Sequence, residues 1–306
     1  ENIAFPIFTV GDIALSSSDK ETHCDLWATC QVTTRTEMTE FEDLTSQESR
    51  ESGLIHRLDT LLANPDSHEF LPLALDIFSY QFTHNQPYAA SAFKLPNFPL
   101  TCGGPVKNTF LTSGTTTETR GAHHFPSTLL YEKAISRAWP LPELPTFFLA
   151  PSNLEASRSS LSHMFGHLNN GDDSRFLLRN SKFHPAPLFD HLRSGEPILL
   201  MGTALAFLHL METFGTIALP PGSHLLETGG YKGTSHSLSK PDFYHDLAGF
   251  FDLPADHIHN EYGMTELSSQ AYSTGPNGAH RFPHWCRHLI LDPETEREVA
   301  PGETGY

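Results

Sequence analysis

The middle of the chain alternates between short apolar runs and longer segments in which apolar residues recur every three or four positions. We predict strands over residues 146–150, 175–179, 197–201, 224–227 and 259–262, and the unbroken apolar run at 197–201 predicts a buried strand there. The periodic segments between them predict helices over residues 127–139, 157–168, 184–193, 204–214 and 241–251. Short strands separated by helices are typical of right-handed βαβ crossovers. The sequence therefore predicts an α/β fold, with mostly parallel sheets sandwiched between helices.

The chain before this alternation is less regular. Residues 1–65 are rich in Ser, Thr and Glu, with short helix-like stretches at 25–29 and 55–62. From residue 68, helical spacing predicts one wide apolar face that we expect to pack onto the main domain: Phe70, Leu71, Leu73, Ala74, Ile77, Phe78 and Phe82. Prolines over 84–107 predict an extended connection. We therefore divide the chain into an N-terminal segment of uncertain structure, 1–65, and a large domain, 66–306.

Composition narrows the class of function. Nineteen Lys and Arg against 36 Asp and Glu give a net charge of −17, which repels a nucleic-acid backbone. The four cysteines form no CxxC pattern, so neither a disulfide framework nor a zinc ribbon is predicted. No apolar run approaches the roughly 18 residues of a membrane span, and the N-terminus lacks a signal pattern. We expect a cytoplasmic protein that binds no nucleic acid.

A glycine-containing loop packed with hydroxyl groups follows the apolar residue Phe110. Gly114 makes backbone N–H groups accessible, and Arg120 adds a charged donor. The hydroxyl donors are Thr112, Ser113, Thr115 and Thr116. Such a loop can wrap a phosphate chain. An ordinary Ser/Thr turn has the same composition, so composition leaves both interpretations open.

A double glycine, Gly229 and Gly230, ends the predicted strand at 224–227 and is followed by Tyr231 and Lys232. Paired glycines at the carboxyl end of a strand let a flat ligand approach the backbone, although a plain turn has the same signature.

A third polar segment follows the predicted strand at 259–262. Tyr262 offers a ring for stacking, Thr265 a hydroxyl group, and Glu266 a carboxylate that could hold Mg²⁺ beside phosphate oxygens. Thr and Glu are also ordinary residues at the start of a helix, which is the competing interpretation.

Taken in this order, the three segments resemble the adenylate-forming ligase superfamily. Residues 112–116 resemble its ATP phosphate loop, and residues 262–266 (Tyr-Gly-Met-Thr-Glu) resemble its Tyr-Gly-x-Thr-Glu signature. Residues 76–85, 227–233 and 261–270 are most similar to acyl-protein synthetases of the LuxE type, which are related to the phenylacetate-CoA ligases. The likeness covers roughly residues 68–306.

The resemblance implies a fold, a reaction and a set of ligands. The fold is the large N-terminal domain of an adenylate-forming ligase. A carboxylate attacks the α-phosphate of Mg·ATP, pyrophosphate leaves, and the acyl-adenylate passes its acyl group to a thiol. For the LuxE type the acid is a long-chain fatty acid, and the acceptor is a cysteine of the synthetase and then of a partner reductase.

The resemblance also implies a role for each matching residue. Those on the β- and γ-phosphates are Thr112, Ser113, Gly114, Thr115 and Thr116. Those at the adenine pocket are Gly229, Gly230 and Tyr231, with Tyr262 stacking on adenine beside Gly263. Thr265 would touch the α-phosphate, and Glu266 would bind Mg²⁺.

The chain departs from the family pattern in three places. Thr117 replaces a glycine, and Arg120 replaces a lysine whose geometry it does not reproduce. The small C-terminal domain, with its catalytic lysine and the acyl-accepting cysteine, would follow Tyr306 and is therefore expected to be absent here. Two rivals stay open: an acyl- or aryl-CoA ligase of the phenylacetate type, and a non-catalytic nucleotide-binding subunit.

Two weaker groups of residues complete the set of candidates. His163 and Met164 lie in a predicted helix whose family counterpart lines the acyl pocket, but they also suit a core position. His284, Cys286 and His288 alternate as they would on one face of a strand that holds zinc, yet no fourth ligand is evident.

Overall fold

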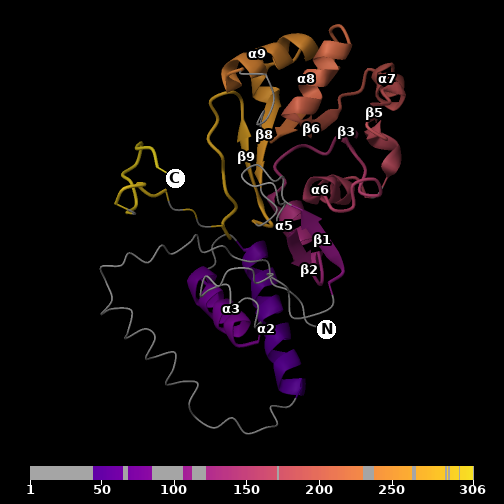
Figure 1. The fold of residues 1–306 in the computed structure, drawn as a ribbon. Helices are drawn as coiled ribbons and strands as arrows, with labels where there is room; N and C mark the ends of the chain where they lie inside the picture. Colours follow the sequence, from indigo (N-terminus) through magenta and orange to yellow (C-terminus); the bar gives the residue numbers. More distant parts are fainter. Residues whose placement is uncertain are drawn as a thin grey trace.

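The structure is a computed structural model, and it describes residues 44–64, 68–84, 106–111, 122–170, 172–229, 238–263, 267–286, 288, 290–295 and 297–305. These residues form a mixed α/β fold with a large, mostly parallel sheet flanked by helices (Figure 1). The strand order of the large sheet is β5-β4-β3-β6-β7-β8-β9. No helix within the described residues is long and apolar enough to cross a membrane.

The five central strands of the large sheet are parallel, and the two edge strands are antiparallel to their neighbours. The central strands are β3 (Thr146–Pro151), β4 (Phe176–Arg179), β6 (Leu199–Thr203), β7 (His224–Thr228) and β8 (Ile258–Gly263). Each lies within two residues of a predicted strand, and the unbroken apolar run at residues 197–201 is the signature of a strand buried on both faces. The edge strands β5 (Lys182–Phe183) and β9 (Gln270–Thr274) are not among the predicted elements.

Two layers of helices cover the sheet. On one face lie α5 (Leu129–Ala138) and α6 (Ser160–Leu168), and on the other lie α7 (Ala186–Leu192), α8 (Ala204–Thr213) and α9 (Lys240–Phe251). Short 3-10 turns, η1 (Asp173–Arg175) and η2 (Ala255–His257), precede β4 and β8. All five helices match predicted ones, and their starts are fixed by side-chain caps where Ser159, Thr203 and Ser239 accept backbone N–H bonds.

The alternation of side chains along β3 shows how the two layers arise. Phe147 and Leu149 join the core under α7, α8 and α9, whereas Phe148 and Ala150 join the core under α5 and α6. Successive side chains of a strand point to opposite faces, so a continuous apolar run fills both cores at once.

Outside the sheet, β1 (Asn108–Leu111) and β2 (Ala122–Phe125) form an antiparallel pair. Phe110 of β1 is fully buried in the same core as α5 and α6. This pair holds the segment that leads into the hydroxyl-rich loop against the main fold.

Two further helices, α2 (Leu44–Ala63) and α3 (Phe70–His84), pack on one another, and α2 also packs on α5. Leu58 of α2 and Leu73 of α3 share a buried cluster with Leu130 of α5. The two sides of the predicted boundary at residue 65 are therefore joined through side-chain packing. The wide apolar face predicted for α3 is wrong in part, because Leu73 and Ile77 are buried but Leu71 is 64% exposed.

Candidate functional site

Two of the three predicted ligand segments start from neighbouring strand ends. In the register of β7 and β8, Thr228 lies opposite Glu261, so Gly229 and Tyr262 follow side by side at the carboxyl edge of the sheet. Gly229 has φ of +77°, a left-handed conformation that favours glycine as the chain leaves β7. Ligands of open α/β sheets bind at this edge.

The Tyr262 side chain is the most exposed ring at this edge. Its residue exposure is 45%, and its ring centroid lies 5.7 Å from that of His280 and 6.0 Å from that of Phe282. An exposed ring held from one side by two others can offer its open face to a flat ligand.

A hydrogen-bonded network lies beneath Tyr262 on the face covered by α9. Oε1 of the buried Glu227 accepts from the Tyr244 hydroxyl at 3.0 Å and from Asn260 Nδ2 at 2.6 Å. His280 Nε2 lies 2.5 Å from Asn260 Oδ1, and since an amide oxygen only accepts, this nitrogen carries the proton. Burial raises the pKa of Glu227, and the bonds from Tyr244 and Asn260 oppose that rise.

A second buried carboxyl group, Glu261, lies on the opposite face of the same strands. The Thr228 hydroxyl donates to Glu261 Oε2. Burial raises the pKa values of Tyr131 and Tyr272, and the nearby charge of Glu261 raises them further. Burial raises the pKa of Glu261 to about 7. Gly263 leaves room for this carboxyl group, because a Cβ there would collide with Glu261 Oε1.

The hydroxyl-rich loop departs from β1 close to this second carboxyl group. The Phe110 ring packs on Tyr131 at 6.2 Å, and the Tyr131 hydroxyl lies 3.5 Å from Gln270 Nε2. Gln270 in turn pairs with Gly263 at the end of β8. The described ends of the three predicted ligand segments therefore lie around one region of the fold.

His163 is held against the same region. Its Nε2 lies 3.0 Å from Glu132 Oε1, and its ring stacks on Tyr131 and lies tilted against Phe110. Burial lowers the pKa of His163, and the carboxylate of Glu132 opposes that shift. Because Nε2 donates to Glu132, the neutral imidazole keeps Nδ1 as an acceptor.

Most of the predicted ligand residues lie outside the described residues. These are Thr112, Ser113, Gly114, Thr115, Thr116, Gly230, Tyr231, Thr265 and Glu266, together with Thr117, Arg120 and Lys232. Gly229, Tyr262 and Gly263 are described, and the structure brings these three together. Their roles toward ATP, and that of Glu266 toward Mg²⁺, stay predictions.

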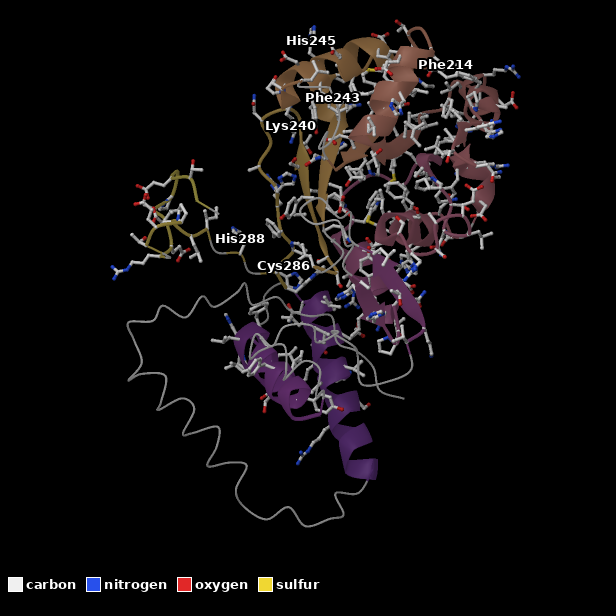
Figure 2. The ribbon with its side chains drawn as sticks, viewed as in Figure 1. Phe214, Lys240, Phe243, His245, Cys286 and His288 are labelled. Atoms are coloured by element: carbon white, nitrogen blue, oxygen red, sulfur yellow. The ribbon has the colours of Figure 1, made fainter. Side chains whose placement is uncertain are left out.

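The zinc cluster considered at His284, Cys286 and His288 does not form. Residues 284–286 are not a strand, and the three side chains have different neighbours: His284 Nε2 lies against the Leu61 carbonyl, Cys286 packs beside α2, and His288 stacks on Phe282 (Figure 2). Among the described residues there is no group of three or more His, Cys, Asp or Glu that could hold a metal.

The two buried carboxyl groups were missed as site residues from the sequence. Glu227 and Glu261 are only 4% and 6% exposed, and Glu227 directly follows the apolar residues Leu225 and Leu226 in its strand. Burying a carboxylate costs free energy, so a Glu at the end of a buried strand was the feature of the sequence that could have indicated a site.

Comparison with known proteins finds a distant similarity to a solved structure. No family model matches the chain, and no curated protein matches it. A solved structure, the adenylation domain of a keto acid-selecting NRPS module bound to keto acyl adenylate, is similar at 17% identity with a TM-score of 0.37. The match covers 88% of this chain and 50% of the other, so the chain spans about half the length of that structure.

Proposed function

We propose that the chain contributes the nucleotide-binding part of an ATP-dependent enzyme that activates a carboxylic acid as its acyl-adenylate. In this reaction a carboxylate oxygen bonds to the α-phosphorus of ATP, and the bond to pyrophosphate breaks. The electron pair of that bond leaves with pyrophosphate. The acyl group then passes to a thiol, and AMP leaves.

The observation that carries this proposal is the convergence of the three sequence segments. Gly229 and Tyr262 are adjacent at the carboxyl ends of β7 and β8, and Phe110, just before the hydroxyl-rich loop, connects to the same edge through Tyr131. Segments 112–116 and 262–266 are about 150 residues apart in the sequence, and they are expected to lie close together in the fold if they bind different parts of one nucleotide.

The described residues suit the adenosine end of such a ligand. Tyr262 offers an exposed ring, and Gly229 leaves the backbone open beside it. The network of Glu227, Asn260 and His280 fixes the strand end that carries Tyr262. Positioning of this kind is the main contribution that a protein makes to reactions at phosphorus.

We further propose a long-chain fatty acid as the substrate and a protein cysteine as the acceptor thiol, and both proposals rest on the resemblance to the LuxE type. An acyl- or aryl-CoA ligase would use the same nucleotide residues and differ in the acceptor. A non-catalytic nucleotide-binding subunit is the second alternative, favoured by the departures at Thr117 and Arg120.

The first test is binding of Mg·ATP, measured by calorimetry. We expect binding to weaken in Glu266→Ala, in Tyr262→Ala and in the double variant Thr115→Ala plus Thr116→Ala. Glu298→Ala, which removes an exposed carboxylate elsewhere, is the matched control and should bind like wild type. Equal affinity in all four variants would contradict the proposed site.

The acceptor is tested by supplying the full-length enzyme with radiolabelled fatty acid, Mg·ATP and either coenzyme A or no added thiol. Label that stays on the protein through denaturation and is released by hydroxylamine supports a protein thioester. Efficient formation of the coenzyme A thioester would instead support the ligase alternative.

A further inference from the structure

Three histidines pack together at the amino ends of β7 and β8, at the opposite edge of the sheet from Gly229 and Tyr262. His224 begins β7, and His257 and His259 lie on either side of the first residue of β8. The ring centroids of His224 and His257 are 4.3 Å apart, with 10° between the ring planes, and those of His224 and His259 are 5.2 Å apart. Nothing in the proposed nucleotide site uses this histidine cluster.

The hydrogen bonds of the histidine cluster determine where its protons lie. His257 Nδ1 lies 2.9 Å from the Ser223 carbonyl oxygen, which only accepts, so this nitrogen carries a proton. His224 Nδ1 and His259 Nε2 are 3.0 Å apart, so one of them donates and the other accepts. His259 Nδ1 lies 2.9 Å from the Thr274 hydroxyl oxygen at the end of β9. The cluster therefore ties the starts of β7 and β8 to the end of β9.

This arrangement limits how many protons the histidine cluster can hold. If His224 and His259 were both imidazolium ions, two N–H groups would face each other, and the hydrogen bond between the rings would be lost. If His224 and His257 were both charged, two like charges would be stacked with their centroids 4.3 Å apart. In an opened chain all three imidazoles bind protons near pH 6.5. Acid therefore favours an opened form of the cluster.

The groups around the histidine cluster do not neutralise added charge. Among the described residues, the acidic side chain that acts on the cluster is Asp256 of η2, which is exposed. The residues of β6 and β9 that pair with the cluster are neutral. Burial and the charges of the two neighbouring histidines lower the pKa of His259 to about 4, and Asp256 opposes that shift only in part. Burial also lowers the pKa of His224.

The segment that follows β9, residues 275–282, connects the histidine cluster to the Tyr262 ring. The segment starts beside the cluster, where Gly275 N donates to the carbonyl of the first residue of β8 at 2.9 Å. It ends beside Tyr262, whose ring centroid lies 5.7 Å from that of His280 and 6.0 Å from that of Phe282. Release of the start of this segment therefore removes one anchor of the residues that support the Tyr262 ring.

We propose that the histidine cluster is an acid-sensitive latch, which holds the end of β9 while its rings are neutral and releases the segment 275–282 when the cluster takes up protons. The opening of the latch is a property of the fold and does not depend on the proposed function. Its consequence for nucleotide binding rests on that function, because the released segment supports Tyr262.

The test is hydrogen–deuterium exchange of peptides covering residues 270–282 at pH 7.5 and pH 5.5, with each rate divided by that of the unfolded chain at the same pH. We expect wild type to lose about tenfold more protection than His259→Gln on acidification. A histidine with a pKa of 6.5 in the open form and about 4 in the closed form shifts the opening equilibrium by that factor. Glu227 and Glu261, whose pKa values are raised by burial, titrate in the opposite sense, and comparison at one pH cancels their effect.

Calorimetry of Mg·ATP binding at the same two pH values tests the consequence for the nucleotide site. We expect acidification to weaken binding more in wild type than in His259→Gln. Absence of Mg·ATP binding at both pH values would contradict the proposed function, whereas the exchange measurement decides the latch by itself.

A second variant and two controls complete the exchange experiment. His257→Gln keeps a donor for the Ser223 carbonyl and removes one ring, so it should also reduce the pH dependence, and it replaces His259→Gln if that variant does not fold. His245→Gln removes an exposed histidine of α9 and should behave like wild type. Peptides of β3 and β6 should exchange alike in all the proteins. The proposal is overturned if wild type and the folded cluster variants share one pH dependence, or if the variants change β3 and β6 as much as residues 270–282.

Discussion

The buried carboxyl group of Glu261 makes the stability of the fold depend on pH in a way that one substitution should abolish. Its pKa rises from an ordinary 4.5 to about 7 on folding, because burial disfavours the ionised form. Below pH 4.5 the group is protonated in both the folded and the unfolded chain. As the pH rises from 4.5 to about 7, the group ionises in the unfolded chain but stays protonated in the folded one, so the fold loses stability.

The size of the effect follows from that shift. A rise from 4.5 to about 7 corresponds to about 3 kcal/mol of unfolding free energy, lost between those two pH values and constant above them. Glu261→Gln keeps the shape of the side chain and an oxygen that can accept from the Thr228 hydroxyl. We therefore expect the variant to match wild type near pH 4.5 and to exceed it by about 3 kcal/mol at pH 8.

The assay is urea unfolding of wild type and Glu261→Gln at pH values from 5 to 8. Histidines and other groups titrate alike in both proteins, so the difference between the two curves isolates Glu261. Glu196→Gln, which changes an exposed carboxylate, should follow wild type throughout. A difference between wild type and Glu261→Gln that does not change with pH would refute the reasoning.

For three other substitutions, the structure predicts the direction in which the free energy of unfolding changes. Gly202→Ala should lower the unfolding free energy by about 1–3 kcal/mol, because its Cβ would lie 2.7 Å from Leu149 Cβ inside the sheet; thermal unfolding measures this, and an unchanged midpoint would contradict it. Tyr244→Phe should cost about 1–3 kcal/mol in urea unfolding, because it removes one of the two donors to the buried Glu227. Tyr272→Phe removes a buried hydroxyl that has no partner among the described residues, so it should be neutral or stabilising; a loss as large as that of Tyr244→Phe would show that the hydroxyl is paired.

Much of the fold was predictable because the central strands are buried on both faces. Their apolar runs, such as residues 197–201, stand out against the helical periodicity on either side. The edge strands carry no such signal. Gln270–Thr274 mixes polar and apolar residues, and its strand conformation depends on pairing with β8, which is set by tertiary contacts.

The helix α2 was predicted only from residue 55 to residue 62, whereas it spans Leu44–Ala63. Its first half is rich in Ser, Thr and Glu, so it has no apolar residues that recur at helical spacing. Its second half carries Leu58, Leu61 and Leu62, which are buried against α3 and α5. The first half therefore gave no periodic signal, whereas the second half carries the leucines that pack on α3 and α5.

For the candidate site, sequence reasoning located the segments but not the groups that position them. Gly229 and Tyr262 could be singled out from the sequence because glycine pairs and the Tyr-Gly-x-Thr-Glu signature are local patterns. Glu227 and Glu261 were not, because their meaning depends on neighbours such as Tyr244 that are distant in the sequence. Which face of the strand each carboxylate points to, and what meets it there, is decided by the packing of separate layers.

The two buried carboxyl groups indicate that the ends of β7 and β8 serve a function, because these groups do not favour the stability of the fold. Glu227 and Glu261 lie on adjacent strands and point to opposite faces, and burial raises the pKa of both. An apolar residue at either position would avoid the free-energy cost of burying a carboxyl group, and β7 has such residues at its buried positions Leu225 and Leu226. Each carboxyl group instead ties together the ends of β7 and β8, through Asn260 on one face and Thr228 on the other. Gly229 and Tyr262 lie directly after the paired residues Thr228 and Glu261. We infer that the buried carboxyl groups lower the stability of the fold but keep these two residues side by side.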